Sequence, residues 1–454
     1  MKTCILDCAR MTERAAAHAY IARALDFPDY YGRNLDALYD CLTDGKRTVV
    51  LRNTAALRDN PYGRRLLDTF RDAAREHPAL LTLTVEEPAA PRPAYADPAD
   101  ARLASMLPYL PQTQGIDFAA LDFSPAVTHA DVEIPEEGYR FLHEAAVTAF
   151  RGVLYAAWYN NPARELSGYT PIRARWSEDG GRSWSPIFTV ADDPSERILY
   201  CPPVFGEDEG KLYLLLNEMV GPDRIHALDL YVLDEATRTF RFLWSRPIPF
   251  KLNTNVLRLS NGKLLLPGRI AELDGFPNTP AVLISDSGHI DAEWRLVCIR
   301  DDGNLPDGAK LVHPELTAIA EGAHIRMFCR DDERRVPLLY TSDDWGETWA
   351  GPWAHEIPFS SSKLYAGTLS TGQHYIIGNR QPDRKALMLL YTRPGESRFS
   401  GGLLLRHEPD AASHYPAACE MDGKLCVIYS ANAPGENSVR GAGLEIVPLE
   451  ALTD

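Results

Sequence analysis

The sequence predicts a multidomain, mainly β protein, in which a β-propeller follows a small α/β domain. Residues 1–88 alternate strand-like runs with helical segments, which is the order of a small α/β layer. Residues 89–112 are rich in Pro and Ala and predict a semi-rigid linker. From residue 113 to residue 454, short apolar runs alternate with turn signals, and few segments have the length of a helix. Many short strands in one long stretch favour a propeller over a single sandwich.

The composition limits the classes of function. Of the 454 residues, 45% are apolar and 24% are charged, which is typical of a soluble globular protein. No run approaches the roughly 18 apolar residues of a membrane span. No apolar signal segment follows Lys2, so we expect a cytoplasmic protein with no membrane partner. A net charge of −16 argues against nucleic acid as a partner.

The sequence contains no pattern that indicates a metal or a cofactor. Its eight cysteines include no pair at C-x-x-C spacing, and most lie in apolar, strand-like runs. A Gly-rich phosphate loop, an H-E-x-x-H motif and a G-x-S-x-G motif are also missing from the sequence. We therefore expect mainly buried free thiols, and a functional site without metal or cofactor.

The first 88 residues divide into strands and helices by their periodicity. A short apolar run suggests a first strand, and later runs rich in Val, Leu and Thr suggest two more. Ala-rich or amphipathic segments with apolar residues at i, i+3 and i+7 predict three helices. The expected strands are 4–8, 47–53 and 80–87, and the expected helices are 11–25, 34–42 and 62–76.

The run FPDYYGRNLDALYDCLT at 27–43 resembles the signature of the barstar family of ribonuclease inhibitors. The resemblance extends over most of residues 1–88 and implies binding of a barnase-like ribonuclease. Asp36 and Asp40 lie one helical turn apart, so both carboxylates can face a cationic cleft. Tyr30 could add an aromatic contact. A solvated helix face, on a domain that has changed its partner, is the alternative.

Two octets predict stapled turns between strands. They read SEDGGRSW at 177–184 and SDDWGETW at 342–349, and a weaker third begins at Ser285. Asp can bond its own nearby backbone, Gly tolerates positive φ, and the final Trp is a large anchor to bury. The second octet fits S-x-D-x-G-x-T-W and the first has Ser in place of Thr, so both resemble the Asp-box of sialidase-like β-propellers. The resemblance covers residues 113–454 and implies six blades around a central site.

In the sialidase family three arginines hold the carboxylate of the substrate. The resemblance assigns these roles to Arg140 in YRFL, Arg330 in HIRMFCR and Arg380 in YIIGNR, with Arg384 as a nearby rival. The planar guanidinium fork binds a carboxylate in bidentate fashion, so three of them at one place make chemical sense.

The family uses a tyrosine as nucleophile, activated by a glutamate. The resemblance gives these roles to Tyr415 in SHYPAACE and Glu315 in HPELTAI. A phenol with a reference pKa near 10 needs a neighbouring base or positive charge to attack. The family's acid/base is an aspartate on a loop, and the best match here is Glu165 in NNPARELSGYTP.

Other polar groups compete for a place at the site. Arg269 and Glu272 lie on or beside a loop that leads to a central strand, and we expect them to shape the substrate pocket. His143, Glu144 and His313 are alternative acid/base groups. The site is therefore expected to hold more charged side chains than the family motif requires.

These residues predict a retaining glycoside hydrolase that resembles an exo-α-sialidase, with a small glycan or sialoside-like substrate. One alternative is a propeller enzyme that acts on another sugar, as a uronidase, a rhamnosidase or a lyase. Another alternative is a non-catalytic propeller, which serves as the binding module of a ribonuclease inhibitor or immunity protein.

Overall fold

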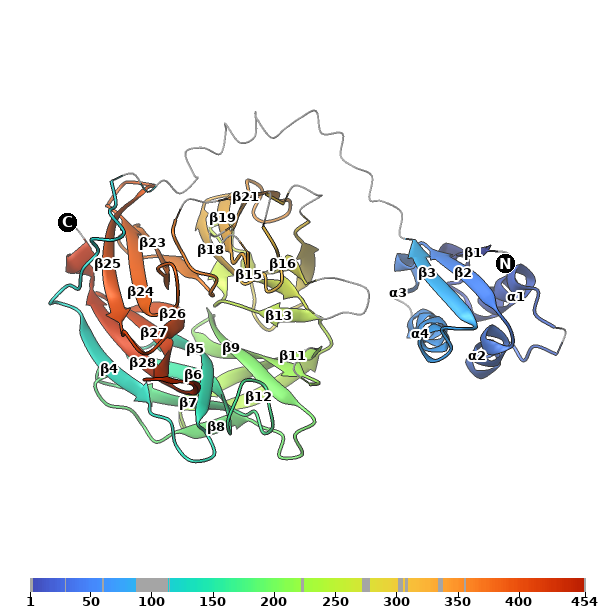
Figure 1. Cartoon of the computed structure of the whole chain (residues 1–454), viewed down its shortest axis with the longest axis horizontal. Helices are drawn as coiled ribbons and strands as arrows, with labels where there is room; N and C mark the ends of the chain where they lie inside the picture. The colour runs from blue at the N-terminus through green and yellow to red at the C-terminus, as the bar shows by residue number, and fades with distance from the viewer. Residues whose placement is uncertain are drawn as a thin grey trace. The chain divides into compact units, whose positions relative to one another are not determined.

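The chain divides into two compact units, Met1–Leu103 and Ala104–Asp454. The computed structural model describes residues 3–28, 30–58, 61–86, 113, 115–221, 224–271, 278–300, 305–306, 309–333, 338–354 and 357–452. Figure 1 shows one unit with helices packed on a small sheet and another built from a ring of sheets. The whole of the predicted linker, 89–112, lies outside the described residues.

The N-terminal unit is a three-stranded parallel sheet in the order β1-β2-β3. Its helix α2 begins at a cap that the sequence supplies, because the Asn34 side chain accepts a hydrogen bond from the amide of Ala37 at 2.8 Å. The helices bury apolar residues such as Leu38 and Phe70 against Leu6 and Leu51 of the sheet. The elements are β1 (Thr3–Asp7), α1 (Arg14–Leu25), α2 (Leu35–Thr43), β2 (Arg47–Arg52), α3 (Ala55–Arg58), α4 (Pro61–Glu76) and β3 (Leu81–Glu86), with a 3-10 turn at Cys8–Arg10.

The second unit is a six-bladed β-propeller, so the predicted fold is confirmed. Its antiparallel sheets follow one another along the chain, and the first strands of successive blades contact each other around the centre. The first three blades consist of β5 (Phe141–Phe150), β6 (Val153–Asn161), β7 (Ile172–Ser177) and β8 (Phe188–Ala191); β9 (Leu199–Asp208), β10 (Lys211–Met219), β11 (Ile225–Asp234) and β12 (Thr239–Arg246); and β13 (Phe250–Leu252), β14 (Leu257–Arg258), β15 (Leu264–Ile270), β16 (Thr279–Ser285) and β17 (Arg295–Cys298).

The sixth blade closes the ring with a strand from the start of the unit. In it β4 pairs with β28, with Leu444 opposite Ala130, and Figure 1 shows the two strands side by side. The last three blades consist of β18 (Leu316–Glu321), β19 (His324–Cys329), β20 (Leu338–Ser342) and β21 (Ala350–Ala354); β22 (Tyr365–Thr368), β23 (His374–Asn379), β24 (Ala386–Thr392) and β25 (Phe399–His407); and β26 (Ser413–Met421), β27 (Lys424–Ala433), β28 (Glu436–Pro448) and β4 (Thr128–Glu133). A 3-10 turn at Leu449–Leu452 follows β28.

The two octets form the same turn between the third and fourth strands of their blades. In the second one, Asp344 accepts hydrogen bonds from the amide and the hydroxyl of Thr348 at 2.9 and 2.5 Å. In the first one, Asp179 accepts the equivalent bonds from Ser183 at 2.8 and 2.6 Å. In both turns the hydroxyl of the first serine accepts a hydrogen bond at 2.9 Å from the amide of the glycine four residues later, Gly181 or Gly346. Sequence and geometry therefore agree on these turns.

The weaker third octet lies at the matching position between β16 and β17. Its Ser285 hydroxyl donates to the carbonyl oxygen of His289 at 2.7 Å. The position of the octet's aspartate is taken by Ser287, so this turn uses the first serine without the aspartate. Asp286, one residue earlier, pairs with Lys263 and Arg295.

Among the described residues, no helix has both the length and the apolar character that crossing a membrane demands.

Candidate active site

Two neighbouring inner strands, β5 and β26, carry the same local distortion. In each, a buried histidine precedes a residue with positive φ: Glu144 at 47° after His143, and Tyr415 at 57° after His414. The pairing with the next strand shifts directly after both pairs, so each is a β-bulge. Such bulges re-aim side chains, and a non-Gly residue in this region costs about 1–3 kcal/mol, so it is typical of functional sites.

Arg330 links the candidate nucleophile to its candidate base. Its Nη1 donates hydrogen bonds to the hydroxyl of Tyr415 and to Oε2 of Glu315, both at 3.0 Å. Its Nη2 lies 2.8 Å from Oδ1 of Asp332, and its Nε donates to the hydroxyl of Ser361 at 3.1 Å. The guanidinium is therefore held on three sides. The structure thus brings Glu315 and Arg330 together with Tyr415, which lies in another blade.

The protonation states of this group suit an activated phenol. Burial and the charge of Glu315 raise the pKa of Tyr415 well above its usual value, although Arg330 and Arg384 oppose this. Burial also acts to raise the pKa of Glu315, but the charges of Arg330, Arg269 and Lys363 outweigh it and leave that pKa lowered. At neutral pH the site thus presents a neutral phenol beside an ionised carboxylate.

Two further arginines face Tyr415. The guanidinium of Arg384 lies 5.5 Å from the centre of the Tyr415 ring, and its Nε and Nη2 donate to the carbonyl oxygen of Ser361. Arg440 lies over Phe141 at 4.4 Å. Burial lowers the pKa of Arg440, and Glu165, Arg384 and Tyr415 are among the charged or polar groups that act on it. The arginines around Tyr415, a region that we call the mouth, are therefore Arg330 and Arg384 by their positions and Arg440 by the effect of its charge.

Arg140 and Arg380 do not join this group, which corrects two of the expected assignments. More than half of the Arg140 side chain is exposed, and it lies 3.5 Å from Glu436 at the surface. Nη1 of Arg380 donates to the carbonyl oxygen of Phe118 at 2.8 Å. Successive side chains of a strand point to opposite faces, and Asn379 already takes the side that faces β26, through a hydrogen bond to the carbonyl oxygen of Ser413.

Lys363 is a site residue that the sequence patterns did not indicate. Its Nζ donates to Oε2 of Glu144 at 2.7 Å and lies 5.9 Å from the Tyr415 ring centre. Both partners of this ion pair are buried. The sequence carried a signal only for the partner of Lys363. Glu144, like Tyr415, follows a histidine, and this repeated pattern marks equivalent inward positions on two blades.

Glu165 lies at the same mouth, on the loop between β6 and β7. The hydroxyl of Tyr159 donates to its Oε1 at 3.3 Å. The residue as a whole is solvent-exposed. Desolvation of its carboxyl group, together with the charge of Glu144, raises the pKa of Glu165. A carboxyl group with a raised pKa near a candidate nucleophile suits a general acid.

The remaining expected residues have different surroundings. Arg269 is buried on β15, and its charge acts on Glu315. Glu272 lies outside the described residues. His313 is half-exposed, 3.7 Å from Asp332, so it lies beside Arg330 rather than at Tyr415.

On the N-terminal unit, the expected partner-binding residues are all at the surface. Asp36 and Asp40 are exposed on α2, one turn apart, and Tyr30 is 81% exposed just before this helix. Its neighbour Tyr31 is buried instead, where its hydroxyl meets Nδ1 of His18. The exposed carboxylates and the exposed ring are thus available to a partner.

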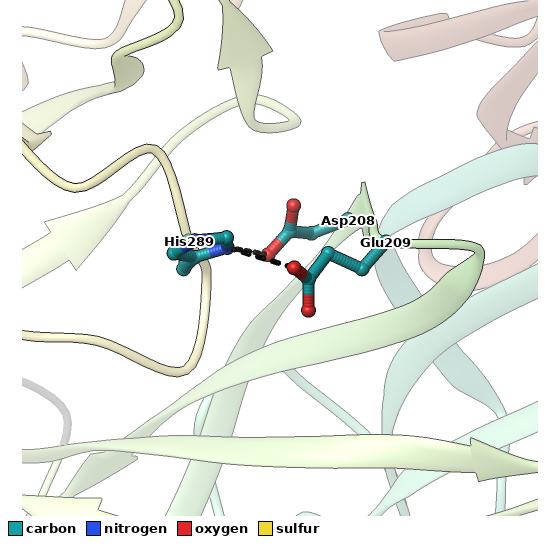
Figure 2. A group of neighbouring side chains, drawn as sticks. All are labelled: Asp208, Glu209 and His289. Atoms are coloured by element: carbon teal, nitrogen blue, oxygen red, sulfur yellow. Dashed lines mark hydrogen bonds and ion pairs between the residues drawn. The ribbon is translucent and has the colours of Figure 1, made fainter.

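One group of side chains away from the mouth has the donor atoms for a metal. Among the described residues, Asp208, Glu209 and His289 bring one ligand atom each within 4.8 Å of one another (Figure 2). Asp208 is already engaged, because its Oδ1 accepts from Arg258 at 2.7 Å and its Oδ2 from the amide of Ile290 at 3.1 Å. These contacts explain the group as a link between two blades.

Comparison with known proteins matches both units to families. The family model described as BNR repeat-like domain matches residues 152–427, and the model described as Barstar (barnase inhibitor) matches residues 1–86. The "Putative ribonuclease inhibitor YrdF" of Bacillus subtilis (strain 168) is 48% identical over 56 residues, which are 12% of this chain and 62% of that protein. The chain thus spans less than two thirds of this relative.

Solved structures resemble the propeller in fold. A protein of unknown function from Dyadobacter fermentans DSM 18053 has a TM-score of 0.57 at 13% identity, covering 72% of this chain and 100% of that one. Trypanosoma rangeli sialidase has a TM-score of 0.57 at 14% identity, covering 71% and 60%. A leech intramolecular trans-sialidase in complex with 2,7-anhydro-Neu5Ac has a TM-score of 0.57 at 12% identity, covering 72% and 71%.

Proposed function

Because the chain belongs to the BNR repeat-like domain family, we propose that its propeller is a retaining glycoside hydrolase for sugars that carry a carboxylate, with sialosides as the first candidates. The observation that carries the proposal is the contact of Arg330 with both Tyr415 and Glu315 at 3.0 Å. The solved sialidases share the fold, which makes this substrate class the natural first choice.

In the first step, Arg330, Arg384 and Arg440 hold the carboxylate of the substrate. The phenol oxygen of Tyr415 attacks the anomeric carbon while Glu315 accepts the phenol proton. Glu165 gives its proton to the departing glycosidic oxygen, so the aglycone leaves as a neutral alcohol. The product of this step is an aryl glycoside, in which the Tyr415 oxygen is bonded to the anomeric carbon.

In the second step, water replaces the tyrosine. Glu165, now ionised, removes a proton from the water as it attacks the anomeric carbon, and Glu315 returns its proton to the phenolate. Two displacements at one carbon retain its configuration. A neutral phenol also avoids the repulsion that a carboxylate nucleophile would meet from an anionic substrate.

Turnover of a fluorogenic sialoside by the full chain tests the proposal, beside a panel of uronides and rhamnosides. Tyr415→Phe should lower kcat by at least about 100-fold, because it removes the attacking oxygen. Tyr155→Phe is the matched control, since Tyr155 is a buried tyrosine of β6 and should keep full activity. Turnover of sialosides by Tyr415→Phe at the parent rate would contradict the mechanism. If the parent protein hydrolyses a uronide or a rhamnoside but no sialoside, sialosides are not its substrates.

For the N-terminal unit we propose binding of a barnase-like ribonuclease. The support is the exposed pair Asp36 and Asp40 on α2, beside the exposed ring of Tyr30, on a domain that matches the barstar model. Carboxylates on one helix face complement a cationic cleft and accelerate association. Inhibition of such a ribonuclease by the full chain tests this role.

A further inference from the structure

Two buried cations lie side by side on the third blade, away from the three arginines of the mouth. Lys251 of β13 is paired directly with Arg269 of β15, so their side chains share one face of the sheet. Only 6% of Lys251 and 4% of Arg269 is exposed. Like charges placed opposite each other in a sheet destabilise it, and burial adds to this cost.

Neither cation has a carboxylate contact among the described residues. Nε and Nη1 of Arg269 are buried without a hydrogen-bond partner. The hydrogen bond found for Lys251 is a weak one, from Nζ to the sulfur of Met219 at 3.6 Å. By contrast, Lys363, which is also buried, and Arg330, which is partly buried, each hold a carboxylate within 3.0 Å. The pair on the third blade thus differs from its neighbours in lacking a close counter-charge.

The segment that carries Lys251 reaches the neighbour of Glu315, because Asn253 accepts a hydrogen bond from the amide of Leu316 at 3.1 Å. The charge of Arg269 acts on Glu315, and that of Lys251 acts on Glu165. The charges that act most on Tyr415 come from Glu315, Arg330, Arg384 and Glu144, and none of them belongs to the third blade. The site therefore has two groups of cations, one at Tyr415 with Arg330 and Arg384, and one on the third blade with Lys251 and Arg269.

We propose that Lys251 and Arg269 form a second anion subsite, which receives a second negative group of the glycan. This deepens the proposed function and rests on it, because the first anion is the sugar carboxylate at Arg330, Arg384 and Arg440. The substrate is then a doubly anionic glycan, with a sulfate ester, a phosphate ester or a second carboxylate at the subsite. All three offer oxyanion oxygens to a lysine and to the guanidinium fork.

Binding of inorganic sulfate to the full chain tests the subsite without any turnover. Isothermal titration at constant ionic strength should find two equivalents of sulfate for the parent protein. Arg269→Gln should lose one equivalent and Arg384→Gln the other. Two equivalents in Arg269→Gln, a single equivalent in the parent that survives in Arg269→Gln, or no sulfate binding at all would each overturn the proposal.

Thermal unfolding without ligand separates a binding role from a structural one. Lys251→Met removes a buried charge without a close partner, so it should raise the unfolding temperature. It should also remove the extra stabilisation that sulfate gives the parent over an equal ionic strength of chloride. If Lys251 is instead a structural counter-charge for Glu165, the variant unfolds at a lower temperature, and that result overturns the subsite.

Turnover identifies the second group once a substrate is found. Fluorogenic sialosides with a sulfate ester, a phosphate ester or a second sialic acid should be compared with the plain sialoside. The best of them should lose about tenfold or more in kcat/KM in Arg269→Gln, the value of one charge-assisted hydrogen bond. Equal losses for the plain and the charged sialosides would overturn the subsite. If no sialoside turns over while two sulfates bind, the proposed function fails and the subsite stands.

Discussion

Glu144 and Tyr415 hold equivalent positions on the inner strands of two adjacent blades. Both follow a buried histidine, both have a positive φ, and both end at a β-bulge. The two histidines touch each other, with ring centres 5.2 Å apart. Burial lowers the pKa of both histidines well below the usual value, and the charge of His414 adds to this effect on His143. Both rings are therefore neutral at pH 7. The backbone at this junction therefore points one carboxylate and one phenol into the same mouth.

The positions of Arg380 and Arg384 predict that the substitution of only one of them, Arg384, will affect KM. Arg384→Gln should raise KM about 10- to 100-fold, because it removes a charged donor for the substrate carboxylate. Arg380→Gln is the matched control and should keep KM within about twofold, since Arg380 binds the Phe118 carbonyl oxygen away from the mouth. Steady-state kinetics on the fluorogenic sialoside measure both. A larger effect of Arg380→Gln would restore the original assignment.

The raised pKa of Glu165 predicts the alkaline side of the pH profile. A general acid must be protonated, so activity should fall as pH rises through the pKa of Glu165, which lies above its usual range. Glu165→Gln should remove this descending limb and lower kcat by about 10²- to 10⁴-fold for poor leaving groups. Aryl leaving groups, which depart without a proton, should suffer less.

Glu144→Gln is the comparison for that experiment, because Glu144 is the competing carboxylate at the mouth. If Glu144→Gln removes the alkaline limb and Glu165→Gln keeps it, the acid is Glu144. The two profiles of kcat/KM against pH decide between them.

The exposed face of α2 predicts where a ribonuclease would bind. Asp40→Ala or Asp36→Ala in the full chain should weaken inhibition of a barnase-like ribonuclease by at least about tenfold, and raised salt should slow association. Asp68→Ala on α4 is the control, since Asp68 is also exposed and lies 3.6 Å from Arg71 on the same helix. Equal inhibition by all three variants and the parent would exclude this face.

Asp229 predicts a pH dependence of stability near neutrality. Burial and the neighbouring Glu218 raise the pKa of Asp229 to about 7. The folded state therefore binds a proton that the unfolded state has released above pH 4. The stabilisation from this proton is fully present below the unfolded pKa and is lost as pH rises towards 7, by up to about 1.4 kcal/mol per pH unit.

Denaturant unfolding at several pH values checks this expectation. Asp229→Asn should flatten the fall in the free energy of unfolding between about pH 5 and pH 7. Asp410→Asn, a change at an exposed aspartate of the same unit, should leave the slope unchanged. A parent protein whose stability rises over this range would contradict the raised pKa.

Local patterns predicted local structure well. The Asp of each octet lies four residues before a Ser or a Thr, so one turn satisfies both side chains. A sequence can encode such a turn without help from the rest of the chain. The fold class followed from the same runs of strands and turns. Tyr415 stands in a short motif within β26, and Glu315 and Arg330 stand in short motifs next to the ends of β18 and β19, so local sequence was enough to single them out.

The other site residues depend on contacts that no local pattern records. Arg380 and Arg384 both follow β23, and only the packing against Phe118 and Ser361 decides which one faces Tyr415. Arg440 reaches the mouth because β28 pairs with β27 over a long hairpin. The neighbours Lys251 and Arg269 are 18 positions apart, and the register of β13 on β15 brings them together.

The strand β4 makes assembly of this unit a late event. The ribosome synthesises β4 before all the blades, yet its partner β28 is the last strand of the chain. Contacts between such distant segments carry a large loop-closure cost and slow folding. Arg440 lies on that last strand, whereas Glu315 and Arg330 belong to an earlier blade. A nascent or truncated chain would therefore lack catalytic competence until the ring has closed, so hydrolysis itself would report complete folding.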